Sequence, residues 1–183
     1  MTVAIYKPRG VVCSKNSAEG RTVFQAFPRY KELNAVGRLD KESEGLLLLS
    51  NDGVITAAVT GDDHIIEKEY EVTVRENVRT WHIKKMEAGV LLDGKRTLPA
   101  RGKLLGPHSF QLIISEGKTH QVRRMADAFR LTITQLLRVR IGNITLRGLS
   151  SGKSRELTHN EVTELKKFKT RAAHKNESLK QLQ

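Results

Sequence analysis

The chain has 183 residues, with 32 Lys and Arg against 20 Asp and Glu, a formal net charge of +12 and one cysteine, Cys13. This length lets a single domain bury roughly two thirds of its unfolded surface, and one cysteine excludes an intrachain disulfide, a cysteine-based zinc site and a Cys-X-X-Cys redox pair. The N-terminus has no apolar signal-peptide core and the apolar run Leu46–Leu49 is far too short to cross a membrane, so we predict a soluble cytoplasmic protein.

The chain begins with a predicted strand. Residues 2–8 (TVAIYKP) are rich in strand-forming side chains and stop at the turn signal Pro8-Arg9-Gly10. Residues 11–14 (VVCS) are predicted as the returning strand.

Two short buried segments follow, on either side of a charged loop. They are residues 33–39 (LNAVGRL) and 45–53 (GLLLLSNDG). Asn51-Asp52-Gly53 is either a turn or the cap of a helix over residues 54–61.

Residues 68–74 (KEYEVTV) alternate strictly and predict a strand, in which one face carries Tyr70, Val72 and Val74. Residues 78–92 have helical spacing that ends near Gly89.

Residues 98–106 and 108–117 are predicted as a pair of strands joined at Gly106-Pro107, and residues 118–129 (KTHQVRRMADAF) return to helix. Residues 132–149 alternate again, which places Arg138 and Arg140 on the face opposite the apolar side chains.

Thr158 and Glu161 form the capping-box pattern that begins a last helix. We expect one catalytic domain over residues 1–168 and a basic, flexible tail over residues 169–183, which has no apolar periodicity. Interleaved strands and helices indicate an α+β fold with a mixed, mostly antiparallel central sheet flanked by helices.

Several motifs that carry chemistry are absent from the sequence. It has no Gly-rich phosphate or dinucleotide loop, no Gly-X-Ser-X-Gly elbow and no histidine pair at metal spacing. We therefore expect no cofactor and no metal, and we interpret the six scattered histidines as ordinary surface residues.

The basic composition favours a polyanionic partner, because phosphate neutralisation supplies most of the nonspecific affinity of nucleic-acid binders. Nucleic acid is the leading candidate, against a generic basic protein kept soluble by its charge. An aromatic content of 5% argues against a long single-strand stacking platform.

Arg38 and Asp40 stand two residues apart, just ahead of the apolar run. A carboxylate held against hydrophobic residues has a raised pKa unless a cation compensates it, so Asp40 needs a partner. Taken alone, an Arg-X-Asp tripeptide is more often a surface ion pair than a catalytic site.

Five stretches together resemble the RsuA-type pseudouridine synthases that act on bacterial ribosomal RNA. The resemblance covers residues 3–167 and implies the catalytic fold of that family, in a short form without its N-terminal S4-like module. One departure is Lys118, where the family usually has arginine or another residue. The stretches are YKPRGVVCS (6–14), GRLDKESEGLLLLSNDG (37–53), KEYEVTV (68–74), SEGKTHQVRRM (115–125) and LRVRIGNITLRGLSSGKSRELT (137–158).

The resemblance implies isomerisation of uridine to pseudouridine in RNA, with Asp40 as the catalytic residue. Asp40 either attacks C1′ or stabilises an oxocarbenium-like species while a 2′-proton is removed. The family pattern pairs it with Arg123 in a buried ion pair, Arg124 being the alternative. It also implies that Tyr70 stacks on the target base and that its hydroxyl takes part in proton transfer, so Tyr70 and Arg123 count as catalytic residues. Lys68 contacts either the surroundings of Asp40 or a phosphate.

The remaining expectations concern RNA. Arg38 holds a backbone phosphate or fills the space left by the flipped nucleotide. We expect a monomer that acts on ribosomal RNA, with a leaning toward a large-subunit stem-loop; the alternative function is a non-catalytic RNA-binding or ribosome-assembly factor. Further phosphate contacts are predicted for Lys7, Arg9, Lys118, Arg124, Arg138 and Arg140.

Overall fold

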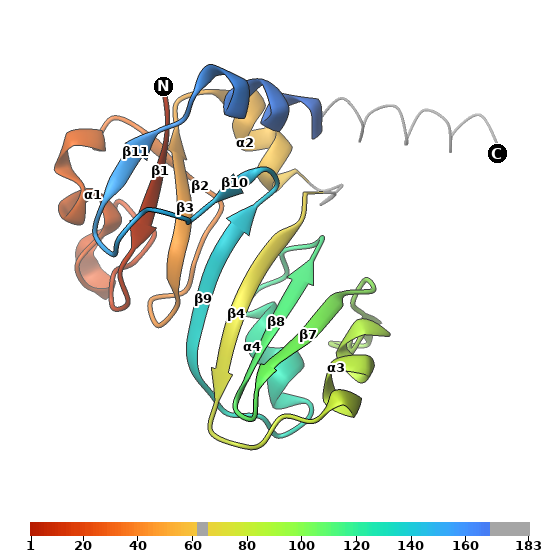
Figure 1. Ribbon diagram of the computed structural model, residues 1–183. Coiled ribbons are helices and arrows are strands. Elements are labelled where there is room, and N and C mark those ends of the chain that lie inside the picture. The colour runs from red at the N-terminus through yellow and green to blue at the C-terminus, as the bar shows by residue number, and fades with distance from the viewer. Residues whose placement is uncertain (62–65, 169–183) are drawn as a thin grey trace.

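The computed structural model describes residues 1–61 and 66–168 (Figure 1). The predicted flexible tail, residues 169–183, lies outside the described residues. The strands are β1 (Thr2–Lys7), β2 (Asn34–Val36), β3 (Glu44–Ser50), β4 (Lys68–Val74), β5 (Leu91–Leu92), β6 (Lys95–Arg96), β7 (Arg101–Gly106), β8 (Ser109–Ile114), β9 (Ile133–Ile141), β10 (Ile144–Thr145) and β11 (Ser154–Glu156).

Across the described residues, nine of these strands form one sheet in the order β11-β1-β3-β9-β4-β8-β7, with β2 beside β3 and β10 beside β9. Its pairings are antiparallel except that of β3 with β9, and β5 and β6 form a separate ribbon. The predicted α+β fold with a mixed, mostly antiparallel sheet is confirmed.

Helices cover both faces of this sheet (Figure 1). None within the described ranges is long and apolar enough to cross a membrane. They are the short turns η1 (Ser17–Glu19) and η2 (Pro28–Tyr30), the helices α1 (Val23–Ala26), α2 (Gly53–Thr60), α3 (Thr80–Glu87) and α4 (Gln121–Asp127), and a last helix over residues 159–168.

Strand β3 is buried on both faces, which explains its run of leucines. Leu47 and Leu49 join the apolar cluster under α1, α3 and α4, whereas Leu46 and Leu48 join the cluster under α2 and the last helix. A strand covered on both sides reads as a continuous apolar run rather than as an alternation. This double burial anchors the chain that leads directly out of the Asp40 loop.

The parallel contact between β3 and β9 is short and depends on a glycine. It pairs Glu44 with Leu137 and Gly45 with Arg138. Gly45 has φ +108°, and a Cβ there would lie 2.4 Å from the backbone oxygen of Arg138. The backbones of the two strands can therefore approach this closely only with glycine at position 45.

Most of the predicted elements are confirmed, including strand 68–74, the helix ending before Gly89 and the strand pair around Gly106-Pro107. Asp52 caps α2 by accepting a hydrogen bond from the Val54 amide. Thr158 and Glu161 form both bonds of the predicted capping box.

The returning strand predicted at residues 11–14 is wrong. Strand β1 is already paired with β11 on one side and with β3 on the other, so no edge is open to it. Val12 instead makes an isolated bridge to Thr22.

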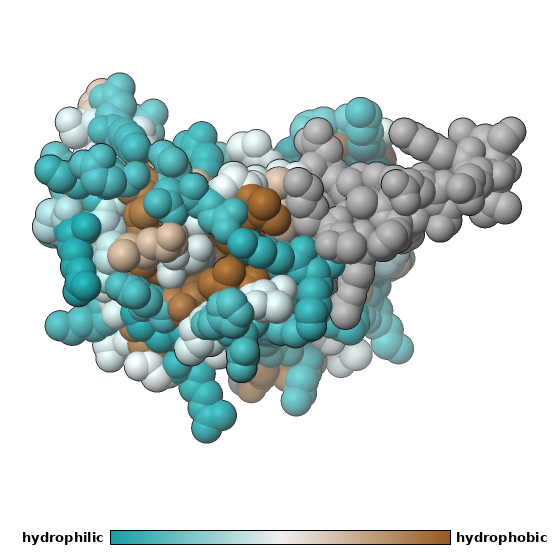
Figure 2. Space-filling model, turned by 90° about the horizontal axis from the view of Figure 1, so that it is seen from above, coloured by the Kyte–Doolittle hydropathy of each residue, from teal (hydrophilic) through white to brown (hydrophobic). Residues whose placement is uncertain are grey.

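Seen from the end where α2 and the N-terminus lie, the surface is mostly hydrophilic, with a band of hydrophobic residues between the polar ones (Figure 2). This agrees with a chain of which 28% is charged.

Candidate functional site

A cavity of about 540 Å³ lies between the loop that joins β2 to β3 and the strands β4, β8 and β9. Its walls come from residues 36–41, from residues 12–14 and from residues 117–122, which lead into α4. Its floor is formed by side chains of β4, β8 and β9, which are Lys68, Tyr70, Ile114, Leu136 and Arg138.

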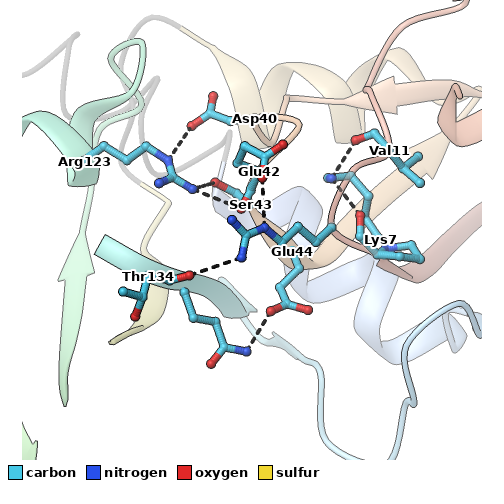
Figure 3. Close-up of polar contacts among 11 residues, drawn as sticks. Lys7, Val11, Asp40, Glu42, Ser43, Glu44, Arg123 and Thr134 are labelled. Atoms are coloured by element: carbon cyan, nitrogen blue, oxygen red, sulfur yellow. Dashed lines mark hydrogen bonds and ion pairs between the residues drawn. The ribbon is translucent and has the colours of Figure 1, made fainter. Parts of the chain in front are cut away.

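Asp40 lies in the wall of this cavity, on the loop between β2 and β3. The Ser43 amide donates to the Asp40 carbonyl oxygen at 3.0 Å and closes the loop into a turn. One carboxylate oxygen of Asp40, Oδ2, lies 3.5 Å from Arg123 Nε (Figure 3). The same oxygen lies 3.2 Å from His120 Nδ1. The loop thus points one carboxylate oxygen at the Arg123 guanidinium and at the His120 ring.

Arg123, rather than Arg124, faces Asp40, as the resemblance predicts. Its Nη2 also donates to the Glu42 carbonyl oxygen at 3.1 Å and to Ser43 Oγ at 3.0 Å (Figure 3). Arg124 turns away and pairs with Asp93 at 2.6 Å. One guanidinium therefore both pairs with the carboxylate and holds the loop that carries it.

The expected ion pair between Arg123 and Asp40 is present, but the expectation that it is buried is wrong. The Arg123 and Asp40 side chains are 27% and 30% exposed. Asp40 lies in the wall of an open cavity, and Arg123 contacts it from outside the cavity lining. Solvent screens such a pair, so its contribution to stability falls well below that of a fully buried one.

His120 is a site residue that sequence reasoning missed, since we interpreted the histidines as surface residues. It directly precedes α4 in a left-handed conformation, with φ 52° and ψ 28°, which is uncommon outside glycine and clusters at functional sites. The signal was its place in SEGKTHQVRRM, three residues before Arg123.

Tyr70 faces into the molecule from β4, as its strand alternation predicts, and is 8% exposed. Arg138 of β9 stands directly across from it, and both residues line the cavity floor. Lys68, two residues before Tyr70, is also buried there. Loss of solvation, followed by the nearby charge of Arg138, lowers the pKa of Lys68 to about 8.

Arg138 is not on an outer face of β9, and that prediction is wrong. A β-bulge shifts the register so that Glu69 pairs with Arg140 and Tyr70 with Arg138, which sends the two arginines to opposite faces of the sheet. Arg138 is 3% exposed; its Nε donates to the Leu46 carbonyl at 2.8 Å and its Nη1 to the Arg38 carbonyl at 3.3 Å. Its Nη2 has no hydrogen-bond partner within the described residues.

Lys7 also conflicts with its predicted phosphate contact. It is fully buried, and its Nζ donates to the carbonyl oxygens of Pro8 and Val11 at 2.9 and 2.7 Å (Figure 3). The ammonium is therefore used to fold the turn after β1.

Of the other predicted RNA contacts, two lie in the cavity lining and two lie outside it. Arg38 and Lys118 line the cavity. Arg9 is half exposed and pairs with Glu42 at 2.9 Å, whereas Arg140 pairs with Glu67 and Glu69 outside the cavity. No group of three or more His, Cys, Asp or Glu in the described ranges is arranged to hold a metal ion.

The chain matches the family described as RNA pseudouridylate synthase over residues 1–128. It is 35% identical to the dual-specificity RNA pseudouridine synthase RluF of Salmonella typhi, over 91% of this chain but only 57% of the relative. The chain thus spans less than two thirds of RluF.

Two further relatives are covered more completely. The chain is 37% identical to ribosomal small subunit pseudouridine synthase A of Haemophilus influenzae, over 88% of this chain and 72% of the relative. It is 36% identical to ribosomal large subunit pseudouridine synthase B of Bacillus subtilis, over 88% of this chain and 70% of the relative.

A solved structure shares the fold. It is titled crystal structure of pseudouridylate synthase, superposes with a TM-score of 0.83 at 35% identity, and matches 90% of this chain and 73% of that one. The similarity extends beyond residue 128, so β9 to β11 belong to the same architecture.

Proposed function

This chain belongs to the RNA pseudouridylate synthase family, and from that premise we propose that it isomerises a uridine of ribosomal RNA to pseudouridine. The observation that carries the proposal is Asp40, held in a cavity beside Arg123 and above a floor that contains Tyr70. A non-catalytic binder has no need of a carboxylate placed in this way.

The substrate uridine must leave its base stack to reach the cavity, at a cost of a few kcal/mol. Arg38 and Lys118 lie in the cavity lining, where they can hold the backbone phosphates of a flipped nucleotide. Tyr70 offers an aromatic face for the base, and such a stack contributes roughly 1–3 kcal/mol.

Asp40 acts on the sugar. Either it attacks C1′ as the bond to uracil N1 breaks, or it stabilises the positive charge on the sugar while a 2′-proton is removed. Both routes require the carboxylate in its ionised form, and Arg123 and His120 lie within 3.5 Å of it. The freed base then turns, C5 bonds to C1′, the C5 proton is lost and N1 gains a proton, so no co-reactant is consumed.

Two of the relatives are named for the ribosomal small and large subunit, and RluF is named only as a dual-specificity RNA pseudouridine synthase. We therefore propose ribosomal RNA as the substrate class and keep the large-subunit stem-loop as a prediction. Mapping pseudouridines in ribosomal RNA from cells without this gene identifies the uridine. Monomeric state, cofactor-independent turnover and cytoplasmic location are further parts of the proposal.

The test is tritium release from ribosomal RNA that carries 5-³H-uridine. Wild-type protein releases tritium because the C5 proton leaves. Asp40→Asn lowers the rate by at least about a thousandfold, as loss of a nucleophile does. The matched control is Asp127→Asn, an exposed carboxylate on α4 outside the cavity lining, which retains the wild-type rate.

No release by the wild type from either deproteinised RNA or ribosomal particles would favour the non-catalytic binder. Equal release by wild type and Asp40→Asn would contradict the role of Asp40 while leaving the enzyme assignment intact.

A further inference from the structure

The floor of the cavity carries two positive charges that no carboxylate of the described residues pairs with. Lys68 is 7% exposed and its Nζ makes one long hydrogen bond, 3.4 Å, to the Ile66 carbonyl oxygen. Arg138 is 3% exposed, and its two hydrogen bonds go to backbone carbonyls. Asp40, the acidic group closest to the reaction, is in the wall and already contacts Arg123 and His120.

Burying two cations side by side is costly unless an anion arrives to compensate them. Arg138 lies close enough to Lys68 for its charge to disfavour the protonated lysine. The arrangement is therefore suited to a ligand that is negative at this depth during part of the reaction cycle.

The phosphates of RNA are poorly placed to be that anion. A phosphate of the flipped nucleotide can instead meet Arg38, an exposed side chain of the cavity lining, whereas Lys68 and Arg138 are buried. The group that reaches Tyr70, directly across the sheet from Arg138, is the base of the flipped nucleotide.

We propose that Lys68 and Arg138 form a cationic floor that stabilises the detached uracil as an anion. The inference rests on the proposed function. When the C1′–N1 bond breaks, its electron pair stays on N1, and the negative charge spreads to the O2 and O4 carbonyl oxygens of the ring. Lys68 can donate to one of these oxygens, and the Arg138 charge acts from within the floor.

The charge on the base exists only between cleavage and the formation of the C5–C1′ bond. Fixed cations aimed at charge that develops during a reaction accelerate it, because they need no reorganisation in a site poor in water. When C5 attacks C1′ and loses its proton, and N1 gains one, the base is neutral again and the floor releases it.

The test compares single-turnover rates on two RNAs that carry either uridine or 5-fluorouridine at the target position. Fluorine stabilises the departing base as an anion, so it reduces the need for the floor. Loss of the starting nucleoside, measured by chromatography of nuclease digests, reports cleavage for both bases.

Lys68→Met lowers the rate on uridine by about a hundredfold, the usual effect of removing one donor from a developing anion. The loss of rate on 5-fluorouridine is smaller than the loss on uridine by a factor of at least several. RNA affinity and its salt dependence stay at wild-type values. The matched control is Lys103→Met on β7, an exposed lysine outside the cavity lining, which leaves both rates unchanged.

Equal losses on the two bases would overturn the proposal, and so would a weaker RNA affinity with a flatter salt dependence, which indicates a phosphate contact. Lys68→Arg and Lys68→Gln repeat the comparison; the charged variant retains more of the uridine rate than the neutral one, and the reverse order contradicts the floor. If wild-type protein converts neither base, the proposed function itself fails, an outcome distinct from all of these.

Discussion

Burial makes Lys68 costly for the fold. An ordinary lysine has a pKa of 10.5, and loss of solvation in the cavity floor lowers that of Lys68 to about 8. Below pH 8 the group is protonated in both the folded and the unfolded chain, so the folded state bears the cost of burying the charge. That cost is on the order of 3 kcal/mol. A residue retained at such a cost is typical of functional sites.

This cost predicts a pH-dependent effect of Lys68→Met. Between pH 8 and 10.5 the unfolded wild type binds more protons than the folded one, so wild-type stability rises with pH relative to the variant. Urea unfolding at neutral pH finds the variant more stable by up to about 3 kcal/mol, with the advantage shrinking toward pH 10.5. An advantage independent of pH would contradict the charge as its cause.

At the scale of elements, the contact between β3 and β9 determines the geometry of the site. It is limited to two residue pairs, yet it joins the strand that follows Asp40 to the strand that carries Arg138 in the floor. Arg138 also bonds the carbonyl of Leu46 in β3 and that of Arg38 in the loop. The position of the loop over the floor therefore depends on how closely these strands approach.

Gly45→Ala tests this dependence. The positive φ and the clash of a Cβ with the Arg138 backbone together cost on the order of 2–4 kcal/mol in unfolding free energy, and tritium release falls with it. The control is Gly53→Ala, where the first turn of α2 leaves open space for a Cβ; it is neutral or slightly stabilising. Chemical denaturation measures both, and equal stabilities would contradict the close approach.

Elements that depend on neighbours in sequence were predictable. The Thr158 and Glu161 capping box is one: Glu161 accepts from the Thr158 amide and receives two hydrogen bonds from Arg155. These hydrogen bonds, chiefly those from Arg155, lower the pKa of Glu161 to about 2. The capping box was predictable from the four consecutive residues 158–161. The contribution of Arg155 was not, because that residue lies in the preceding strand, β11.

At the scale of the whole molecule, the net charge of +12 overstates the surface available to RNA. Lys7 and Arg138 are buried, and Arg9, Arg140 and Arg155 are in ion pairs. In the cavity lining, Arg38 is left for a phosphate contact, whereas Lys118 pairs with Glu116 at 3.4 Å.

RNA binding should therefore depend on salt through a small set of contacts. The logarithm of the affinity falls linearly with the logarithm of the salt concentration, with a slope of about −0.7 for each phosphate contacted on single-stranded RNA. Arg38→Gln flattens the slope by about one such contact. Arg101→Gln, an exposed arginine paired with Glu67 outside the cavity, leaves it unchanged; a slope near zero for the wild type would contradict an electrostatic interface.

The sequence by itself determined the α+β fold class, most elements, the capping box of the last helix and the candidacy of Asp40, Tyr70 and Arg123. Periodicity, capping and motif resemblance each act within a short stretch of chain. Only the tertiary structure decided that Lys7 is structural, that His120 contacts Asp40 and that Arg138 is in the cavity floor. Arg138 illustrates the reason: its direction is set by a bulge against a strand some 70 residues earlier. A pairing between distant strands leaves no trace in the alternation of either one.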